Sequence, residues 1–370
     1  MKPDFTEIAK HFRFDGQFVE ATPYGDGHIN DTYAAHFRNP GGTLHRYLLQ
    51  RINHNVFKNP VELMQNIERV TRHIQLKIAA AGGDPTRETL NLIPTSEGIF
   101  LYQSAEGNYW RAFLFIEDAK TYNNPINPKH IYSAARTFGI FQRFLADFPA
   151  ETLHETIPNF HHTQKRFETF VKAVELDRYN RVSQVKDEIH FAQSRAGDTS
   201  VLIDLLARGE LPLRITHNDT KLNNVMIDNK TGEGICMIDL DTVMPGLSLY
   251  DFGDAVRTGT ALAAEDETDL PKVGFSLSTF EQLAHGYLDA ARVFLTPTEI
   301  DYLAFSARLM TLEQGIRFLT DYLSGDVYFK THREHHNLDR CRTQFRLVGA
   351  METHYDEMRA IIKKYGTGYS

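Results

Sequence analysis

Polar and charged residues crowd one short segment of the chain, "THNDTKLNN", which lies between two apolar runs. Asp219 is followed by Lys221 two positions later and by Asn224 five positions later, and Asp239 comes 20 residues after Asp219. Because Asn and Asp favour turns, a polar turn is the simplest interpretation. The residue types and their spacing indicate more, since they match the parts that phosphoryl transfer from a nucleotide requires.

These four side chains fit three separate tasks in that reaction. One carboxylate must orient the attacking hydroxyl group and accept its proton, which we assign to Asp219. Oxygen ligands must hold Mg²⁺ between the phosphates, and Asn224 and Asp239 supply them. A cation should offset charge on the transferred group, and Lys221 provides it. The segment therefore predicts an ATP- and Mg²⁺-dependent kinase site.

The expected secondary structure brings these residues together. The segments "NVMID" and "ICMIDLD" flank the turn "NKTGEG" and predict a β-hairpin. Because hairpin strands lie about 5 Å apart, Asp239 on the second strand is expected near Asn224 at the start of the first. Asp241 shares a strand face with Asp239 if the strand continues, so it could bind a second metal or the substrate, or else stabilise the loop.

The rest of the chain predicts two lobes around this hairpin. The first third holds apolar runs typical of strands, "VEATPYGDGHINDTYAAHF", "RYLLQRI", "GIFLY" and "YWRAFLFI", and one helix that begins at Asn59 and Pro60. After the turn-rich connector "FIEDAKTYNNPINP", the pattern is mostly helical. We expect an α+β fold, with a smaller sheet-containing lobe at residues 1–117 and a larger helical lobe at residues 118–370.

The composition narrows the classes of partner. The chain has 370 residues and 48 acidic against 40 basic side chains, a net charge of −8, which argues against a broad nucleic-acid surface. Cys236 and Cys341 make neither a disulfide scaffold nor a zinc cluster, which favours a reducing compartment. Without an apolar run of about 18 residues or a signal-peptide pattern, we expect a cytoplasmic protein with no membrane partner.

The segments "HNDTKLNN" and "IDLD" resemble the catalytic loop and metal segment of the aminoglycoside phosphotransferase and choline kinase family, which shares the protein-kinase fold. "PYGDGHIN", "IDLDTVMPG", "DFGDAVR" and "GIRFLTDYLSGDVYF" are similar to the branch of this family that phosphorylates N-acetylhexosamines, from about residue 20 to beyond residue 345. The resemblance implies a two-lobed kinase-like fold and transfer from ATP to the anomeric hydroxyl of a free N-acetylhexosamine, giving the 1-phosphate. Alternative acceptors are another sugar, a choline-like amino alcohol or an aminoglycoside. A further alternative is a nucleotide-binding scaffold without catalysis.

The resemblance also implies roles for single residues. Asp219 aligns with the catalytic base, which also contacts the substrate, and Asn224 and Asp239 align with the Mg²⁺ ligands. Arg317 and Tyr328 align with contacts to the sugar, and His28 is implied to contact both sugar and nucleotide. The turn implied to cover nucleotide and sugar holds Gly25, Asp26, Gly27, His28 and Asn30.

Several of these residues have simpler interpretations. Arg317 could form a salt bridge with Asp321, four residues later on the same helix, because a buried arginine needs a partner. Tyr328 could belong to the core. His161 and His162 are adjacent and would point in different directions on a helix, which argues against a shared ligand site.

Two features depart from the protein-kinase pattern. The third strand reads "LLQRIN" and has no lysine in the usual nucleotide-pairing place. Arg46 or Arg51 could replace it, and we assign Arg51 to the nucleotide, although it lies on the strand face opposite Gln50. The letters "DFG" begin at Asp251, 32 residues after Asp219. Since Asp239 has the expected offset for the metal, we expect Asp251 to support the catalytic loop instead, through His217.

Overall fold

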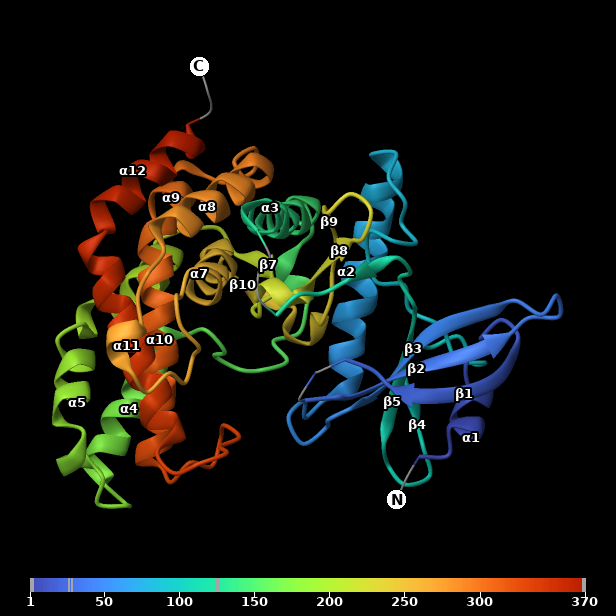
Figure 1. Ribbon diagram of the computed structural model, residues 1–370, viewed down its shortest axis with the longest axis horizontal. Helices are drawn as coiled ribbons and strands as arrows, with labels where there is room; N and C mark the ends of the chain where they lie inside the picture. Colours follow the sequence, from blue (N-terminus) through green and yellow to red (C-terminus); the bar gives the residue numbers. More distant parts are fainter. Residues whose placement is uncertain (1–2, 26, 28, 124–126, 368–370) are drawn as a thin grey trace.

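The computed structural model of the protein describes residues 3–25, 27, 29–123 and 127–367 (Figure 1). A smaller lobe holds an antiparallel sheet of five strands in the order β1-β2-β3-β5-β4. Its strands are β1 (Gln17–Pro23), β2 (Asp31–Arg38), β3 (Leu44–Ile52), β4 (Tyr102–Gln103) and β5 (Tyr109–Leu114). The larger lobe is mainly helical, so the expected α+β architecture, with a smaller sheet-containing lobe and a larger helical lobe, is confirmed.

Strand alternation gives the sheet two different faces. Leu49 and Trp110 pack with Phe12 in a core formed with the short helix α1 (Phe5–Lys10), which the sequence analysis did not predict. Ile52 instead faces the other side and joins the core shared with the larger lobe. Side chains two apart on a strand share a face, so this split fixes the direction of every residue on β3.

Helix α2 (Pro60–Ala80) lies between the sheet and the larger lobe (Figure 1). The Asn59 side chain accepts a hydrogen bond from the Glu62 amide, and Pro60 occupies the first turn, as predicted. The apolar positions that step by three and four are all buried: Leu63, Ile67, Val70 and Ile74. Each such side chain stabilises the fold by about 1.5–3 kcal/mol when fully buried, so this stripe fixes α2 against its neighbours.

The larger lobe contains short strands and long helices. Its strands are β6 (Ala119–Lys120), β7 (Arg214–Thr216), β8 (Val225–Asp228), β9 (Gly234–Met237) and β10 (Met244–Gly246). Its helices are α3 (Pro128–Phe144), α4 (Thr163–Leu176), α5 (Lys186–Gln193), α6 (Val201–Ala207), α7 (Ser248–Gly259), α8 (Leu277–Ala291), α9 (Pro297–Asp301), α10 (Leu303–Leu323), α11 (His336–Thr353) and α12 (Tyr355–Gly366). No helix within the described ranges combines the length and apolarity that crossing a bilayer demands.

Two small sheets hold the polar loop of the sequence motif. One pairs β7 with β10, and the other has the order β6-β8-β9, which confirms the predicted hairpin. The second strand is shorter than expected, because the backbone at Asp239 turns into the left-handed region (φ 60°, ψ 56°) and a 3-10 turn follows over Leu240–Thr242. The strand ends before Asp241, so the condition under which it would share a strand face with Asp239 is not met.

A single apolar core crosses from one lobe to the other. It includes Ile52 and Leu63 from the smaller lobe and Phe138, Val225 and Leu249 from the larger lobe. Strand β6, just after residue 117, pairs with β8 of the larger lobe. The proposed division at residues 117 and 118 stays a prediction, and the apolar packing continues across it.

Candidate active site

A buried carboxylate, that of Asp251, binds the backbone of the loop between β7 and β8. Asp251, only 1% exposed, accepts hydrogen bonds from the backbone amides of His217 (2.9 Å) and Asn218 (2.7 Å). Gln142 Nε2 donates a third bond to it (2.8 Å). Burial raises the pKa of Asp251, although its hydrogen bonds act against that rise. The expectation that Asp251 supports the loop is confirmed.

His217 links the two segments that carry the motif carboxylates. Its Nε2 lies 2.8 Å from the carbonyl oxygen of Ile238, the residue before Asp239, and its Nδ1 lies 3.3 Å from the amide nitrogen of Asp219. A carbonyl only accepts and an amide only donates, so Nε2 carries the hydrogen and Nδ1 accepts. The histidine of the motif is therefore a neutral connector in this arrangement.

Asp219, Lys221 and Asn224 form a contiguous cluster at the start of β8. The Lys221 ammonium nitrogen lies 2.9 Å from Asp219 Oδ2, and Asn224 Nδ2 donates to the same oxygen (3.1 Å) and to the Asp219 carbonyl (2.8 Å). Burial lowers the pKa of Lys221, but the nearby carboxylates, Asp219 foremost, raise it further and leave it above its ordinary value. Lys221 is therefore a cation at neutral pH.

Asp239 joins this cluster from the end of β9. The amide of Ile238 donates to the Asn224 carbonyl (2.9 Å), which brings the following residue beside the cluster. The Asp239 side chain is accessible to solvent on one side. The protein atoms around its carboxylate nevertheless remove part of its hydration. This desolvation, followed by repulsion from Asp241 and Asp219, raises the pKa of Asp239 to about 6.

This donor set suits a hard divalent cation. The negative charges of Asp241 and Asp219 contribute to the raised pKa of Asp239. A bound cation would relieve this repulsion between carboxylates. Asn224 uses its Nδ2 for hydrogen bonds, which leaves Oδ1 available as a ligand. Across the part of the chain that the structure describes, no group of three or more His, Cys, Asp or Glu side chains could hold a metal. One carboxylate and one amide oxygen are nevertheless typical for Mg²⁺ that is also bound by phosphates.

Asp241 points into the contact between the lobes. It forms a buried ion pair with Arg111 of β5, and both residues are 2% exposed. Asn30 Nδ2 donates to Asp241 (2.5 Å), and Arg111 Nε donates to Gln50 of β3 (3.0 Å). Of the roles left open for Asp241, these contacts support a stabilising one. Sequence reasoning missed Arg111, although a charge within the apolar run "YWRAFLFI" was a usable signal.

Arg51 lies elsewhere. It shares its strand face with Leu49, which packs under α1, and it pairs with Asp31 on the neighbouring strand. Gln50, on the opposite face, is the residue that meets Arg111. Alternation directs Arg51 away from the Arg111–Asp241 contact, and its assignment to the nucleotide stays a prediction. Arg46 pairs with Glu117, and its guanidinium lies over the aromatic ring of Phe115.

The glycine turn is only partly described. Asp26 and His28 lie outside the described residues, so their predicted roles stay predictions. Gly25 adopts a left-handed conformation (φ 76°), and a Cβ atom built on Gly25 or Gly27 would meet nothing within 4 Å. Asn30, at the end of the turn, accepts a hydrogen bond from the Asn53 amide (2.9 Å) in addition to its bond with Asp241.

Arg317 and Tyr328 are neighbours. The Arg317 guanidinium lies 6.0 Å from the Tyr328 ring centroid and 5.2 Å from that of Phe160, and it donates to Gln314 (3.0 Å). The alternative salt bridge was wrong, because Asp321 instead accepts backbone amides from residues 327–329. Tyr328 is 63% exposed, so it is not a core residue either.

The two lobes and the polar cluster between β7 and β9 define a kinase-like phosphotransferase. Residues 20–290 match the family model described as the phosphotransferase enzyme family, which includes the aminoglycoside phosphotransferases. Because the match covers most of the chain, the protein belongs to this family. It is an enzyme of the class that transfers phosphoryl groups to hydroxyl groups.

Solved structures share this fold. An aminoglycoside phosphotransferase from Alicyclobacillus acidocaldarius aligns over 98% of this chain and 97% of its own, with a TM-score of 0.60 and 12% identity. A microcompartment-associated aminopropanol kinase aligns over 96% and 97%, with a TM-score of 0.55 and 13% identity. A spectinomycin phosphotransferase, solved with ADP and spectinomycin, aligns over 95% and 98%, with a TM-score of 0.52 and 14% identity. At these identities the likeness concerns the fold.

Proposed function

We propose that this enzyme is an N-acetylhexosamine 1-kinase. It transfers the γ-phosphoryl group of ATP, with Mg²⁺, to the anomeric hydroxyl of N-acetylglucosamine or N-acetylgalactosamine. The observation that carries the proposal is the meeting of Asp219, Lys221, Asn224 and Asp239 at the adjoining ends of β8 and β9. The choice of acceptor rests on the segments that resemble the sugar-kinase branch and on the pairing of Arg317 with Tyr328.

The chain's own residues mainly position the reactants and balance charge. Asp219 orients the anomeric hydroxyl and accepts its proton, and the Lys221 ammonium beside it offsets charge on the transferred group. Asn224 Oδ1 and the Asp239 carboxylate would hold Mg²⁺. When bound, the metal neutralises the charge that the phosphates bring.

The acceptor side favours a neutral sugar over a cation. Arg317 and Arg166 are close enough that each repels the other's charge, and burial together with this repulsion lowers the pKa of Arg166. A choline-like or aminoglycoside cation bound beside Arg317 would meet the same repulsion. The guanidinium and the exposed Tyr328 hydroxyl instead offer donors and acceptors suited to sugar hydroxyls and an acetamido group.

The proposal is tested by measuring ADP release with N-acetylhexosamines, hexoses, choline, ethanolamine and an aminoglycoside as acceptors. A product whose phosphorus resonance couples to the sugar H1 establishes transfer to the anomeric oxygen. Turnover of choline or the aminoglycoside with none of the N-acetylhexosamines would move the enzyme to another acceptor class. ADP release that no acceptor increases would favour a scaffold without sugar kinase activity.

Asp219→Asn tests the proposed base directly. Loss of a general base lowers turnover by at least about a hundredfold. Binding of ATP should change little, because Asn224 and Asp239 remain. The measurement is kcat from ADP release together with the Kd for ATP. Near-normal kcat in this variant contradicts the assignment.

A further inference from the structure

We infer that His161 and Glu313 act as a positioning pair for the catalytic loop. Both side chains are buried, at 8% and 1% exposure. His161 Nδ1 lies 2.8 Å from Glu313 Oε1, and its Nε2 lies 3.2 Å from the carbonyl oxygen of Asn218, the residue before Asp219. Thr163 donates to the second oxygen of Glu313 (2.6 Å), which fixes the carboxylate in turn.

The hydrogen-bond partners determine where the protons lie. A backbone carbonyl only accepts, so Nε2 of His161 must carry a hydrogen. Nδ1 faces a carboxylate, so one more proton is shared between this nitrogen and Glu313. Burial raises the pKa of Glu313, but His161 and its other partners lower it further and leave it below its ordinary value. With an acceptor at each ring nitrogen, the hydrogen-bond pattern is that of an imidazolium facing a carboxylate.

One peptide unit connects this pair to the proposed base. The carbonyl of the bond between Asn218 and Asp219 accepts from His161, and the amide of the same bond donates to His217 (3.3 Å). Two histidines thus hold the plane of the peptide that precedes Asp219. His217 belongs to the motif, whereas His161 reaches the loop from the segment before α4.

The backbone just before this peptide has an uncommon conformation, because Asn218 is in the left-handed region (φ 64°), which Asn adopts more readily than most non-glycine residues. Asp251 fixes its amide and the Thr242 carbonyl accepts from its side chain (2.8 Å), but only His161 is bonded to its carbonyl within the described residues. Without His161, rotation of this peptide would move the Asp219 carboxylate relative to Lys221.

The pair also ties the loop to the proposed acceptor contact. Glu313 lies on α10, one helical turn before Arg317, and Phe160, next to His161, lies 5.2 Å from the Arg317 guanidinium. This inference rests on the proposed function where it names Asp219 as the base and Arg317 as an acceptor contact. The hydrogen bonds themselves do not depend on that proposal.

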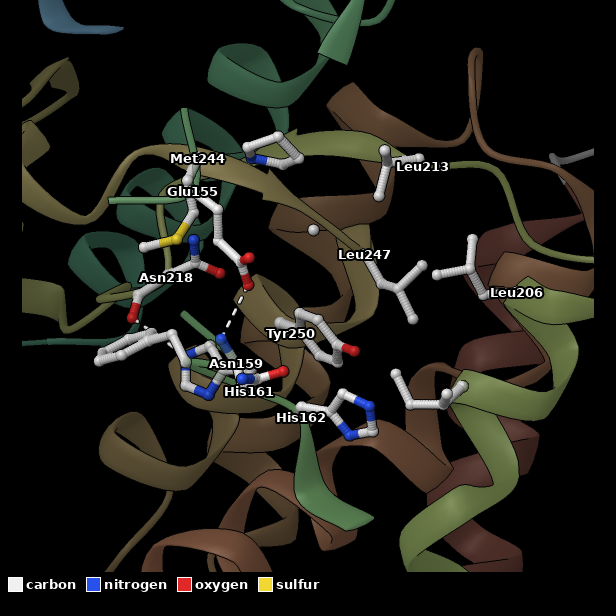
Figure 2. A pocket seen from close by; sticks show the side chains of 14 residues that line it. Glu155, Asn159, His161, His162, Leu206, Leu213, Asn218, Met244, Leu247 and Tyr250 are labelled. Carbon is white, nitrogen blue, oxygen red and sulfur yellow. Dashed lines mark hydrogen bonds between the residues drawn. The ribbon is translucent and has the colours of Figure 1, made fainter. Parts of the chain in front are cut away.

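A cavity beside the pair makes a sharp test possible. It has a volume of about 120 Å³, and its wall includes His161, His162, Asn218 and Tyr250 (Figure 2). Removing the His161 ring would enlarge this space next to the Asn218 carbonyl. Free imidazole could then enter and donate to that carbonyl, because the space left by the His161 side chain matches a small ring.

The experiment compares His161→Ala with His162→Ala, a neighbouring residue on the same cavity wall that makes no contact with the loop among the described hydrogen bonds. ADP release is measured with ATP and N-acetylglucosamine, or with the fastest acceptor of the panel if that sugar is not turned over. His161→Ala should lower kcat about tenfold to a hundredfold, because small misplacements of a catalytic group cost that much. In His161→Ala the KM for ATP should stay unchanged, and added imidazole should restore kcat. The kcat of His162→Ala should equal that of the wild type.

A second pair of variants covers the case in which His161→Ala does not fold. In Glu313→Gln the amide can donate to a neutral His161 and keep the ring in place, whereas Glu313→Leu cannot. Glu313→Gln should therefore retain clearly more kcat than Glu313→Leu. Equal kcat in these two variants overturns the inference, as does wild-type kcat in a folded His161→Ala or a loss of kcat that imidazole does not reverse.

Asp219→Asn separates this inference from the proposed function. If that variant keeps its turnover, the base assignment fails regardless of His161. If Asp219→Asn loses turnover while His161→Ala does not, the base assignment stands and only the positioning role fails.

Discussion

Two buried ion pairs hold the loops of the candidate site, and they differ in what they join. Arg111–Asp241 connects β5 of the smaller lobe to the segment just after Asp239. His161–Glu313 lies wholly within the larger lobe and reaches the peptide just before Asp219. The geometry of the proposed metal segment thus depends on how the lobes meet, while that of the proposed base is set inside one lobe.

The cations of the two pairs also differ chemically. The Arg111 guanidinium keeps its charge at any ordinary pH, so it cannot adapt if Asp241 loses its charge. An imidazolium can release its proton and remain a hydrogen-bonding ring. Buried charges are costly without a partner, so the pair that cannot neutralise itself should tolerate substitution least. Matched amide substitutions of the two carboxylates examine this difference.

Asp241→Asn should have the largest effect on stability. It leaves the Arg111 charge buried without a counter-charge, which costs about 3–5 kcal/mol when one partner of a buried pair is removed. The free energy of unfolding from urea denaturation measures the loss. The double variant Arg111→Met/Asp241→Leu serves as the control and should recover much of it, since apolar replacement of both partners is often neutral. A loss below about 1 kcal/mol, the range of exposed pairs, would show that Asp241 contributes no more than a surface contact.

Glu313→Gln should cost less than Asp241→Asn. The His161 ring releases a proton and accepts from the new amide, so the cost is that of one weakened buried hydrogen bond, about 1–3 kcal/mol. The same urea titration gives the comparison, with Thr163→Val as a control that removes one hydrogen bond to Glu313 and no charge. If Glu313→Gln destabilises the protein as much as Asp241→Asn, the contrast between the two cations is wrong.

The smallest effect is expected at a partly buried contact between the lobes, where Asp228 of β8 accepts from Arg87 (3.1 Å). Backbone amides of Thr231 and Lys230 lower the pKa of Asp228 to about 2. Because the folded-state pKa is depressed, the ionised carboxylate stabilises the fold above its ordinary pKa, and this contribution is lost as the pH falls toward 2.

Asp228→Asn should therefore destabilise the protein slightly at pH 7 and less at pH 3. Thermal unfolding of wild type and variant at both pH values measures the gap. A gap that is constant with pH would mean that the turn depends on the shape of the side chain and gains nothing from its charge.

Several elements could be predicted because their signals are local. Helix α2 follows from its Asn59 cap and its apolar stripe, and the β8–β9 hairpin follows from two apolar runs around a turn. The supporting role of Asp251 could be predicted from its offset from Asp219. The end of β9 could not be predicted, because an alternating apolar pattern does not indicate the left-handed conformation of Asp239.

The misses concern contacts between distant parts of the chain. Alternation showed that Gln50 and Arg51 face opposite ways, but only the packing of α1 under Leu49 decides which face meets the larger lobe. Asp321 was expected to pair along its helix and instead binds three amides of the next loop. A rule based on sequence spacing predicts the nearest partner along the chain. A buried polar group instead pairs with the partner in space that best satisfies its hydrogen bonds.

The sequence by itself determined which groups the proposed chemistry uses, because the proposed base, cation and metal ligands stand at fixed offsets in one hairpin and the loop before it. Only the tertiary structure decided which groups hold them in place. Arg111 meets Asp241 across 130 residues, and His161 meets Glu313 across 152. Such pairs arise because a charge removed from water must find a counter-charge in space, and no periodicity along the chain records where that partner lies.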